Sequence, residues 1–207
     1  DAAPVVAPPK PRASGAKATR LIADYTESRV CALLEDGGVT CWGGSSLEDP
    51  APHRVANLTN VVDLSLRGGR LVVARADGSA ALIRSDRLDE PPVPFPVADV
   101  KRVGASDSSV CAVRGEGRVT CWRSAGPRAI AFARPEDIPN VNDAAALAVD
   151  EMSSCAVRKT GALACWSRGR RTAPLAYEGI EGVTEIVFVR PTALIVGVFD
   201  GAASVVA

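Results

Sequence analysis

The feature that most constrains this chain is a pair of cysteines, spaced C-x9-C, inside a repeat of about 40 residues. Three segments align closely: CALLEDGGVTCW from Cys31, CAVRGEGRVTCW from Cys111 and CAVRKTGALACW from Cys155. Two weaker copies are VVARADGSAALI from Val72 and IVGVFDGAASVV from Ile195. Successive starts lie 41, 39, 44 and 40 residues apart, so five repeats fill residues 19–207. A period of this length is typical of propeller blades.

Each repeat also contains two further short stretches suited to strands. A stretch rich in Val and Ile precedes each copy: LIADY, VVDLSL, VADVKRV, VNDAAALAV and VTEIVFV. A stretch that combines Pro with apolar residues follows the first four copies: PAPHRVANL, PPVPFPV, PRAIAFA and APLAYEGI. Four short strands per repeat, separated by Gly or Pro, predict an all-β fold, a β-propeller of about five short blades with disulfide-stapled hairpins.

The cysteines are present or absent as pairs, which is what a covalent bridge predicts. Val72 and Leu82 occupy the two cysteine positions of the second repeat, and Ile195 and Val205 occupy those of the fifth. The alternatives are buried free thiols or a metal site, but two thiolates nine residues apart, without a nearby His, make a poor zinc site. We therefore predict three disulfides, Cys31–Cys41, Cys111–Cys121 and Cys155–Cys165.

The same segments predict the geometry of the hairpins. If the two cysteines are directly opposed, a three-residue loop remains, such as Glu35-Asp36-Gly37, with Gly in third place in every copy. That place requires a left-handed residue, which Gly adopts without strain. Opposed residues of a non-hydrogen-bonded pair lie roughly 4.5 Å apart at Cα, within reach of a disulfide. Closing a ring of 11 residues stabilises the fold by about 3 kcal/mol in the chain-entropy model.

Charge and composition argue against several functions. The formal net charge is zero, which gives no reason to expect nucleic acid or an anionic membrane as partner. His53 is the only histidine, so a Ser-His-Asp or Cys-His site would depend on it, and we expect no catalytic, cofactor or metal site. No run of 18 apolar residues occurs, so no transmembrane segment is expected. Disulfides indicate an oxidising location: periplasm, cell surface or medium.

The first 18 residues, DAAPVVAPPKPRASGAKA, differ in composition from the repeats. Their Pro and Ala content predicts an extended tether, of a kind that would also allow N-terminal anchoring to a membrane. A second interpretation is that Pro4–Ala7 forms a closing strand for the fifth repeat, which stops just after its hairpin. The domain organisation is therefore a tether or closing strand over 1–18 and a propeller over 19–207.

The motifs SRVCALLEDGGVTCWGG and VGASDSSVCAVRGEGRVTCW resemble bacterial repeats of the regulator-of-chromosome-condensation type. Those repeats typically read G-x-x-H-[ST]-C-A-L and then D-G-x-V-x-C-W-G, and the second and fifth repeats here are degenerate copies. The resemblance implies a propeller, usually of seven blades, and proteins that bind other proteins, including a nucleotide-exchange factor and a β-lactamase inhibitor. The family His and the G-Q-L-G segment are missing here, so no binding residue is carried over.

Two sets of recurring residues suggest chemistry as well as structure. An acid occurs in or beside each Val-rich stretch, and paired carboxylates in a central funnel would suit a carbohydrate-active enzyme; a polar strand edge is the alternative. Trp follows the second cysteine in three repeats and either stacks on ligands or, as we expect, packs between blades. These residues are Asp24, Asp63, Asp99, Asp143, Glu185, Trp42, Trp122 and Trp166.

The loops that follow the Trp positions are charged and differ between repeats, and repeat symmetry places them on one face. Loops on a rigid scaffold are common sites of recognition. We therefore expect a secreted or surface protein-interaction or scaffold module, not an enzyme, that binds a protein partner through these loops; a purely structural module is a third interpretation. The candidate partner-binding residues are Arg84, Arg87, Arg123, Arg128, Arg168, Arg170 and Arg171.

Overall fold

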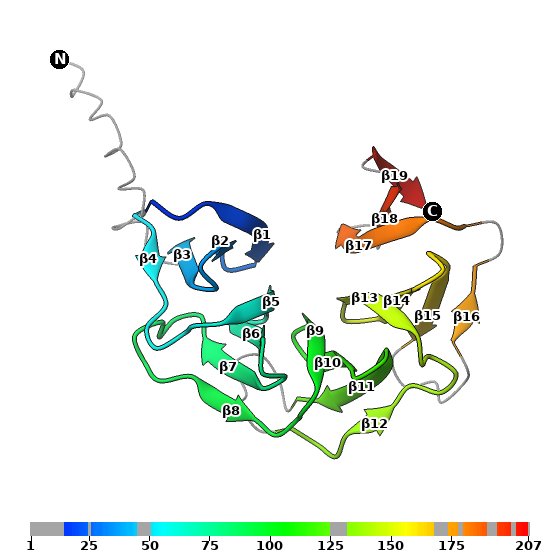
Figure 1. Ribbon diagram of the computed structural model, residues 1–207, viewed down its shortest axis with the longest axis horizontal. Helices are drawn as coiled ribbons and strands as arrows, with labels where there is room; N and C mark the ends of the chain where they lie inside the picture. The colour runs from blue at the N-terminus through cyan, green and yellow to red at the C-terminus, as the bar shows by residue number, and fades with distance from the viewer. Residues whose placement is uncertain are drawn as a thin grey trace.

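A computed structural model describes residues 15–24, 26–44, 51–124, 132–167, 174–177, 180–189, 194–199 and 202–206. These residues form five antiparallel sheets in sequence, here called blades 1 to 5, arranged in an arc around a common centre (Figure 1). The first strand of each blade lies on the inside of the arc, and the fourth strand lies on the outside. The all-β propeller predicted from the repeat is confirmed. No helix in the described part of the chain is long and apolar enough to cross a membrane.

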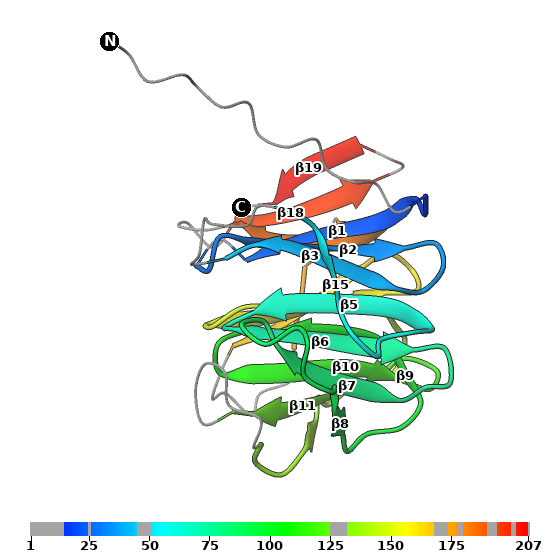
Figure 2. The ribbon, with the colours of Figure 1, turned by 90° about the vertical axis from the view of Figure 1, so that its left-hand side faces the viewer.

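The strands of each blade follow the chain order, from the inside to the outside of the arc (Figure 1). Seen from the side, the strands of blade 2 lie next to those of blade 1 (Figure 2). Blades 1 to 4 have four strands each, and blade 5 has three among the described residues. The strands are β1 (Ala18–Asp24), β2 (Arg29–Leu34), β3 (Val39–Gly43), β4 (His53–Arg54), β5 (Val61–Arg67), β6 (Arg70–Arg75), β7 (Ala80–Arg84), β8 (Val93–Phe95), β9 (Val100–Ala105), β10 (Ser109–Arg114), β11 (Arg118–Arg123), β12 (Glu136–Asp137), β13 (Ala144–Val149), β14 (Ser153–Arg158), β15 (Leu163–Ser167), β16 (Leu175–Ala176), β17 (Val183–Val189), β18 (Leu194–Phe199) and β19 (Ala202–Val206).

The predicted three-residue hairpin loops are present between the second and third strands of blades 1 to 4. In blade 5, Phe199 pairs with Ala202 and Val196, not Ile195, is opposed to Val205, so the predicted alignment of that hairpin was wrong by one residue. In blade 1, the Leu34 N–H donates to the Gly38 carbonyl at 2.9 Å, which leaves residues 35–37 as the loop. The third loop residue has a positive φ in each described hairpin of this type, as the glycine pattern predicts. The values are 72° at Gly37, 81° at Gly78, 127° at Gly117 and 82° at Gly161.

All six cysteines form the three predicted disulfides, each within one hairpin. The bridged residues are directly opposed in the strand register, with Cα–Cα distances of 4.1 Å for Cys31–Cys41 and 4.0 Å for the other two pairs. In blade 2, Val72 and Leu82 are opposed in the same way. The bridge thus strengthens a hairpin register that the repeat also forms without it.

The core lies between blades, in four clusters that each join consecutive blades. Cys31 and Cys41 pack against Leu64 and Leu71 of blade 2, and Val72 and Leu82 of blade 2 pack against blade 3. The clusters between blades 3 and 4 and between blades 4 and 5 follow the same pattern. Each disulfide therefore contributes buried surface to the interface with the following blade.

The arc is open between β1 and β17, which are the inner strands of its two end blades (Figure 1). Leu21 of β1 is 63% exposed, whereas Leu64, at the corresponding position of β5, is 1% exposed against blade 1. Val187 of β17 is 52% exposed for the same reason, because no described blade follows blade 5. The proposed closing strand at Pro4–Ala7 lies outside the described residues.

The third strand-like stretch of blade 3 was wrongly placed at PRAIAFA. Of its described residues, Phe132 forms an isolated bridge with Ser124, and the Ala133 N–H donates to the Arg123 carbonyl at 2.8 Å. The outer strand is instead Glu136–Asp137, paired with Thr120 and Cys121. Both residues of β12 are exposed, so this short edge strand needs no apolar side chain. The apolar Phe132 is partly buried and packs between blades 2 and 3.

Candidate functional site

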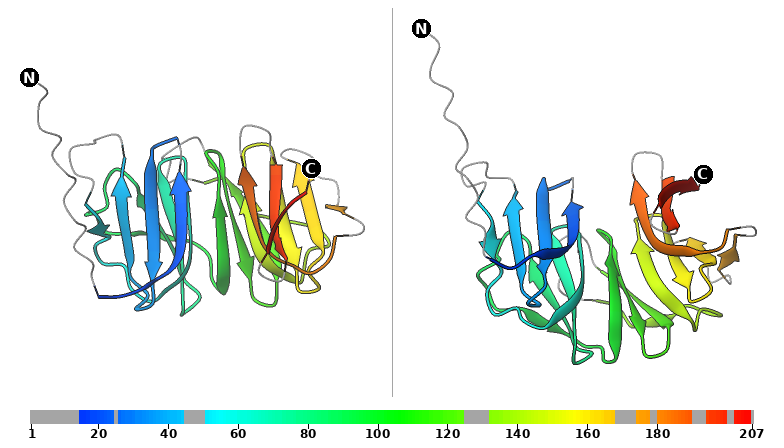
Figure 3. Two further views of the ribbon diagram at one scale, coloured as in Figure 1. Left: turned by 90° about the horizontal axis from the view of Figure 1, so that it is seen from above. Right: turned by 45° about the horizontal axis from the view of Figure 1, so that its top comes forward.

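The candidate site lies on one face of the arc, which we call the loop face. Because strands alternate in direction, the connections from first to second strands and from third to fourth strands leave the same end of every blade (Figure 3). The loops that follow the Trp positions belong to this face. Its described connections between first and second strands include residues 26–28, 68–69, 106–108 and 150–152.

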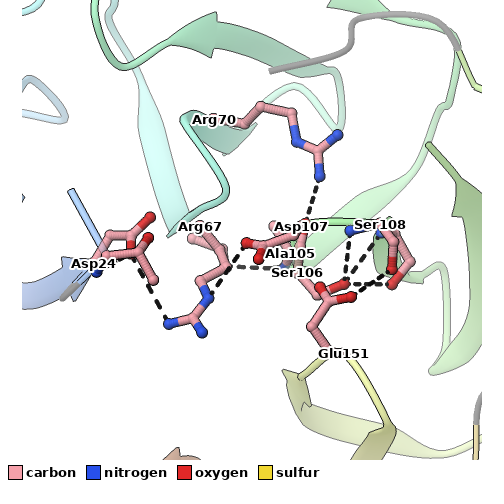
Figure 4. Close-up of polar contacts among 11 residues, drawn as sticks. Asp24, Arg67, Arg70, Ala105, Ser106, Asp107, Ser108 and Glu151 are labelled. Carbon is pink, nitrogen blue, oxygen red and sulfur yellow. Dashed lines mark hydrogen bonds and ion pairs between the residues drawn. The ribbon is translucent and has the colours of Figure 1, made fainter. Parts of the chain in front are cut away.

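Charged side chains gather at the inner edge of this face, in what we call the inner-rim cluster (Figure 4). Arg67 lies between two carboxylates: one guanidinium nitrogen is 3.9 Å from Asp24 Oδ1, and its Nε is 3.6 Å from Asp107 Oδ1. Asp24 is fully buried, and its Oδ1 also accepts hydrogen bonds from the backbone N–H and the hydroxyl of Thr26. The cluster comprises Asp24, Arg67, Arg70, Ser106, Asp107, Ser108 and Glu151.

Arg70 is a buried cation that joins blades 2 and 3. Its guanidinium donates to Ser124 Oγ at 2.5 Å and to the Ser106 carbonyl, and it lies 5.7 Å from the centroid of the Phe132 ring. Burial lowers the pKa of Arg70 below its usual value, and the charges of Asp107 and Glu151 oppose that shift. The buried cation thus depends on the carboxylates of the cluster for electrostatic compensation.

Asp107 and Glu151 bring two negative charges close together between blades 3 and 4. Burial, and then the neighbouring charge of Glu151, raise the pKa of Asp107 above its usual value. The Ser108 hydroxyl donates to Glu151 Oε2 at 3.0 Å and so links the two blades. Ion pairs of Arg67 and hydrogen bonds of Arg70 and Glu151 thus connect the loops of adjacent blades within this cluster.

Sequence reasoning missed the inner-rim cluster, although a signal was present. The residues come from short connections and from the strand ends beside them, such as RGGR over 67–70 and SDSS over 106–109, which have few apolar positions and no strand periodicity. Their charged and hydroxyl side chains recur at the same place in successive repeats. Alignment of the connections by strand register, rather than by apolar pattern, would have identified them.

The five recurrent acids do not share one structural position, so the expectation that they recur at one place in the blade was wrong. The strand registers place Asp24 at the end of β1, whereas Asp63 is the third residue of β5. Asp99 and Asp143 precede their strands, at the hairpin end of the blade. Alignment of the repeats by their apolar residues did not place the acids correctly, because the first strands have register shifts near their starts. Of the other four acids, only Asp63 occupies the strand position that corresponds to that of Glu185.

The Trp side chains pack between blades where a preceding blade exists. Trp122 is buried between blades 2 and 3, with its ring centroid 4.8 Å from that of Phe95 in an edge-on contact. Trp166 is partly buried between blades 3 and 4. The prediction of a packing role is confirmed for these two. Trp42 has the same register on blade 1, which no described blade precedes, and it is partly exposed.

Three of the seven predicted partner-binding arginines are among the described residues. Arg84 forms two hydrogen bonds with the carboxylate of Asp86, at 3.1 and 2.9 Å, and Arg87 contacts Glu90 at 2.7 Å. Arg123 is exposed at the end of β11. Arg128, Arg168, Arg170 and Arg171 lie outside the described residues.

A cavity of about 590 Å³ opens beside Arg123, between blades 3 and 4. Its volume falls within the range of about 300–1,000 Å³ that is usual for ligand sites. Apolar groups and charged groups both contribute to its walls. They include Trp166, the Cys111–Cys121 disulfide, Ile138, Arg123, Arg134, Glu136, Asp137 and Glu151.

Comparisons with known proteins give the fold. No protein-family model matches the sequence, and no curated protein sequence matches it. Among solved structures, yeast RCC1 (Prp20) bound to Kap60 superposes with a TM-score of 0.68 at 16% sequence identity, covering 93% of this chain and 56% of that chain. Human WBSCR16 gives a TM-score of 0.63 at 13% identity, covering 86% of this chain and 58% of that one.

A third similar structure is the ectodomain of the Arabidopsis thaliana receptor kinase ACR4, with a TM-score of 0.59 at 17% identity. The superposition covers 95% of this chain and 67% of the ACR4 ectodomain. The chain thus has the fold of RCC1-type propellers and spans a little more than half the length of the first two neighbours. At these identities the likeness shows the fold alone.

Proposed function

We propose that this chain is a protein-binding propeller module that acts outside the cytoplasm and contacts its partner through the loop face. The observation that carries the proposal is the exposed Arg123 beside the cavity, on the face where the inner-rim cluster holds the loops. Exposed groups on a preorganised frame lose little conformational freedom on binding, which favours recognition.

The charges of this face suit contact with another protein. Arg84 and Arg87 each pair with an acid close in sequence and remain exposed, so that their guanidinium groups are accessible to a partner. Arginine is enriched at the energetically important positions of protein interfaces. Structural neighbours bind proteins: one is bound to Kap60, and another is described by its binding to Gsp1p and histones.

The disulfides support a location in an oxidising compartment. All three are formed and none links two blades, so each hairpin carries its own bridge. Disulfides of this structural kind persist in the periplasm, at the cell surface or in the medium, and are rare in the cytosol.

The test is affinity capture from the cell envelope of the source organism, followed by mass spectrometry. We expect Arg123→Glu to reduce the amount of captured partner by about tenfold, which corresponds to about 1.4 kcal/mol of binding free energy, because like charges brought together at an interface repel. Arg118→Glu is the matched control, because Arg118 is also an exposed residue of β11 but lies at its hairpin end. Equal losses with both variants would mean that the loop face is not the contact surface.

A further inference from the structure

The chain fills the outer space between adjacent blades with apolar side chains from its own loops. Between blades 1 and 2, Leu88 of the β7–β8 connection packs against the core cluster. Its carbonyl accepts a hydrogen bond of 3.1 Å from the Ala56 N–H, which holds the loop against the linker between the two blades. We call such a residue a loop plug.

Phe132 is the loop plug between blades 2 and 3. It comes from the β11–β12 connection and packs against the cluster between those blades. Its ring centroid lies 5.0 Å from that of Phe95, in an edge-on contact, and Arg70 lies over its face. In two successive interfaces, the connection from a third to a fourth strand thus supplies a large apolar side chain that packs between the blades.

The corresponding connection of blade 4 carries no such residue. Its sequence from Ser167 to Pro174 is SRGRRTAP, which has no large apolar side chain. The next residue, Leu175, belongs to β16 and is 72% exposed. The cavity of about 590 Å³ lies at this interface, between blades 3 and 4.

The cavity wall combines an apolar surface with a charged edge. Trp166, Ile138 and the Cys111–Cys121 disulfide supply apolar surface, as the residues around Leu88 and Phe132 do in the other two interfaces. Arg123, Arg134 and Glu136 are exposed and line the same cavity. This is the arrangement of an interface pocket that takes one anchor side chain and surrounds it with polar contacts.

We propose that the cavity between blades 3 and 4 receives a leucine or phenylalanine side chain from an extended segment of the partner protein. The partner supplies in trans the loop plug that the chain supplies itself in the two preceding interfaces. The exposed arginines and Glu136 bind polar and charged groups that flank this side chain in the segment. This inference rests on the proposed function, since it assigns the chemistry of that contact.

The first test uses a small probe and needs no partner. N-acetyl-L-phenylalaninamide is titrated into the full chain, and the indole N–H signals of the three Trp residues are followed by NMR. We expect the Trp166 signal to shift and that of Trp42, at the far end of the arc, to stay in place. N-acetyl-L-alaninamide, which lacks the large side chain, should bind about tenfold or more weakly.

Two variants fill the cavity from its edge. Ala133→Leu and Ser167→Leu each add apolar volume at an exposed lining residue, and both should weaken probe binding about tenfold. Ala98→Leu is the control, because Ala98 is exposed but lies outside the cavity. An unshifted Trp166 signal, equal binding of both probes, or binding unchanged in the two filling variants would overturn the inference.

The second test separates this inference from the proposed function. In affinity capture, Ala133→Leu should reduce recovery of the partner, whereas Ala98→Leu should leave it unchanged. If the partner is captured, is lost with Arg123→Glu and is retained with Ala133→Leu, the protein-binding function stands and the anchor pocket is refuted. If no protein is captured while the probe binds, the proposed function fails instead.

Discussion

The buried carboxylate of Asp63 accepts a hydrogen bond of 2.8 Å from the backbone N–H of Val103 and so joins the inner strands of blades 2 and 3. The same side chain pairs with Arg20 of blade 1. Through one residue, the inner strands of three consecutive blades are tied together. Burial is the largest influence on its titration and raises the pKa of Asp63 above the usual value of 3.8.

Replacement of this carboxylate by an amide should change the pH dependence of stability. Because the folded-state pKa is raised, the protonated form is favoured on folding, so this stabilisation is complete below the unfolded pKa and is lost as pH rises through the folded pKa. The difference in unfolding free energy between the wild type and Asp63→Asn should therefore fall as pH rises from about 4, and then level off. Urea unfolding of both proteins over a pH series measures it. A difference that is independent of pH would contradict the prediction.

The disulfide of blade 3 should be the first to be reduced. Cys121 is only partly buried and lies in the cavity wall with Cys111, whereas both cysteines of the other two pairs are buried. Thiol–disulfide exchange requires access of the attacking thiolate, so mild reductant should open this bridge before the others. Alkylation at timed intervals and peptide mapping would show the order. Simultaneous labelling of all three pairs would mean that exposure does not control the reaction.

A fourth bridge should form in blade 2. Val72 and Leu82 are opposed in the same register as the bridged cysteines of the other hairpins. The double variant Val72→Cys/Leu82→Cys should therefore oxidise without rearrangement and stabilise the oxidised protein by up to about 3 kcal/mol over its reduced form. Free-thiol titration and urea unfolding test this. The two single variants, each with one unpaired thiol, serve as controls and should gain nothing from oxidation.

Two leucines at corresponding positions should respond differently to truncation. Leu64→Ala removes a side chain buried between blades 1 and 2 and should cost about 2–5 kcal/mol. Leu21→Ala removes its counterpart on the open side of blade 1 and should change stability by less than about 0.5 kcal/mol. Equal losses, measured by urea unfolding, would show that the open face of blade 1 is covered in solution.

Deletion of residues 1–14 tests whether Pro4–Ala7 closes the fifth blade. The deletion leaves Lys17 in place, whose carbonyl accepts a hydrogen bond from the Glu35 N–H at 2.9 Å. If the segment covers a sheet edge, its removal should lower the melting temperature and cause concentration-dependent association, because unpaired edges recruit other strands. A monomer with an unchanged melting temperature would show that the segment is a tether.

The fold was predictable because each repeat has the same order of strand-forming stretches with a glycine at the hairpin turn. The C-x9-C spacing and the glycine at Gly37 and its equivalents determine a hairpin of one register, and that register sets which side chains face the next blade. The site was not predictable in the same way. Arg70 begins a strand and Asp107 lies in a connection, both outside the periodic apolar pattern, and their roles depend on contacts between repeats. Phe132 was assigned to an edge strand because apolar residues near Pro are typical of the fourth stretch of each repeat. In the structure its side chain packs between two sheets instead.

The placement of every bridge within a single hairpin also determines what a protease can release. A cut after the exposed Lys159 falls inside the ring closed by Cys155 and Cys165, so the two fragments remain one covalent molecule until the bridge is reduced. A cut after the exposed Arg54 falls between blades, where no bridge spans the break, and the fragments are then held only by packing. The hairpin tips therefore tolerate nicking, whereas the linkers between blades are the points at which the chain can be divided.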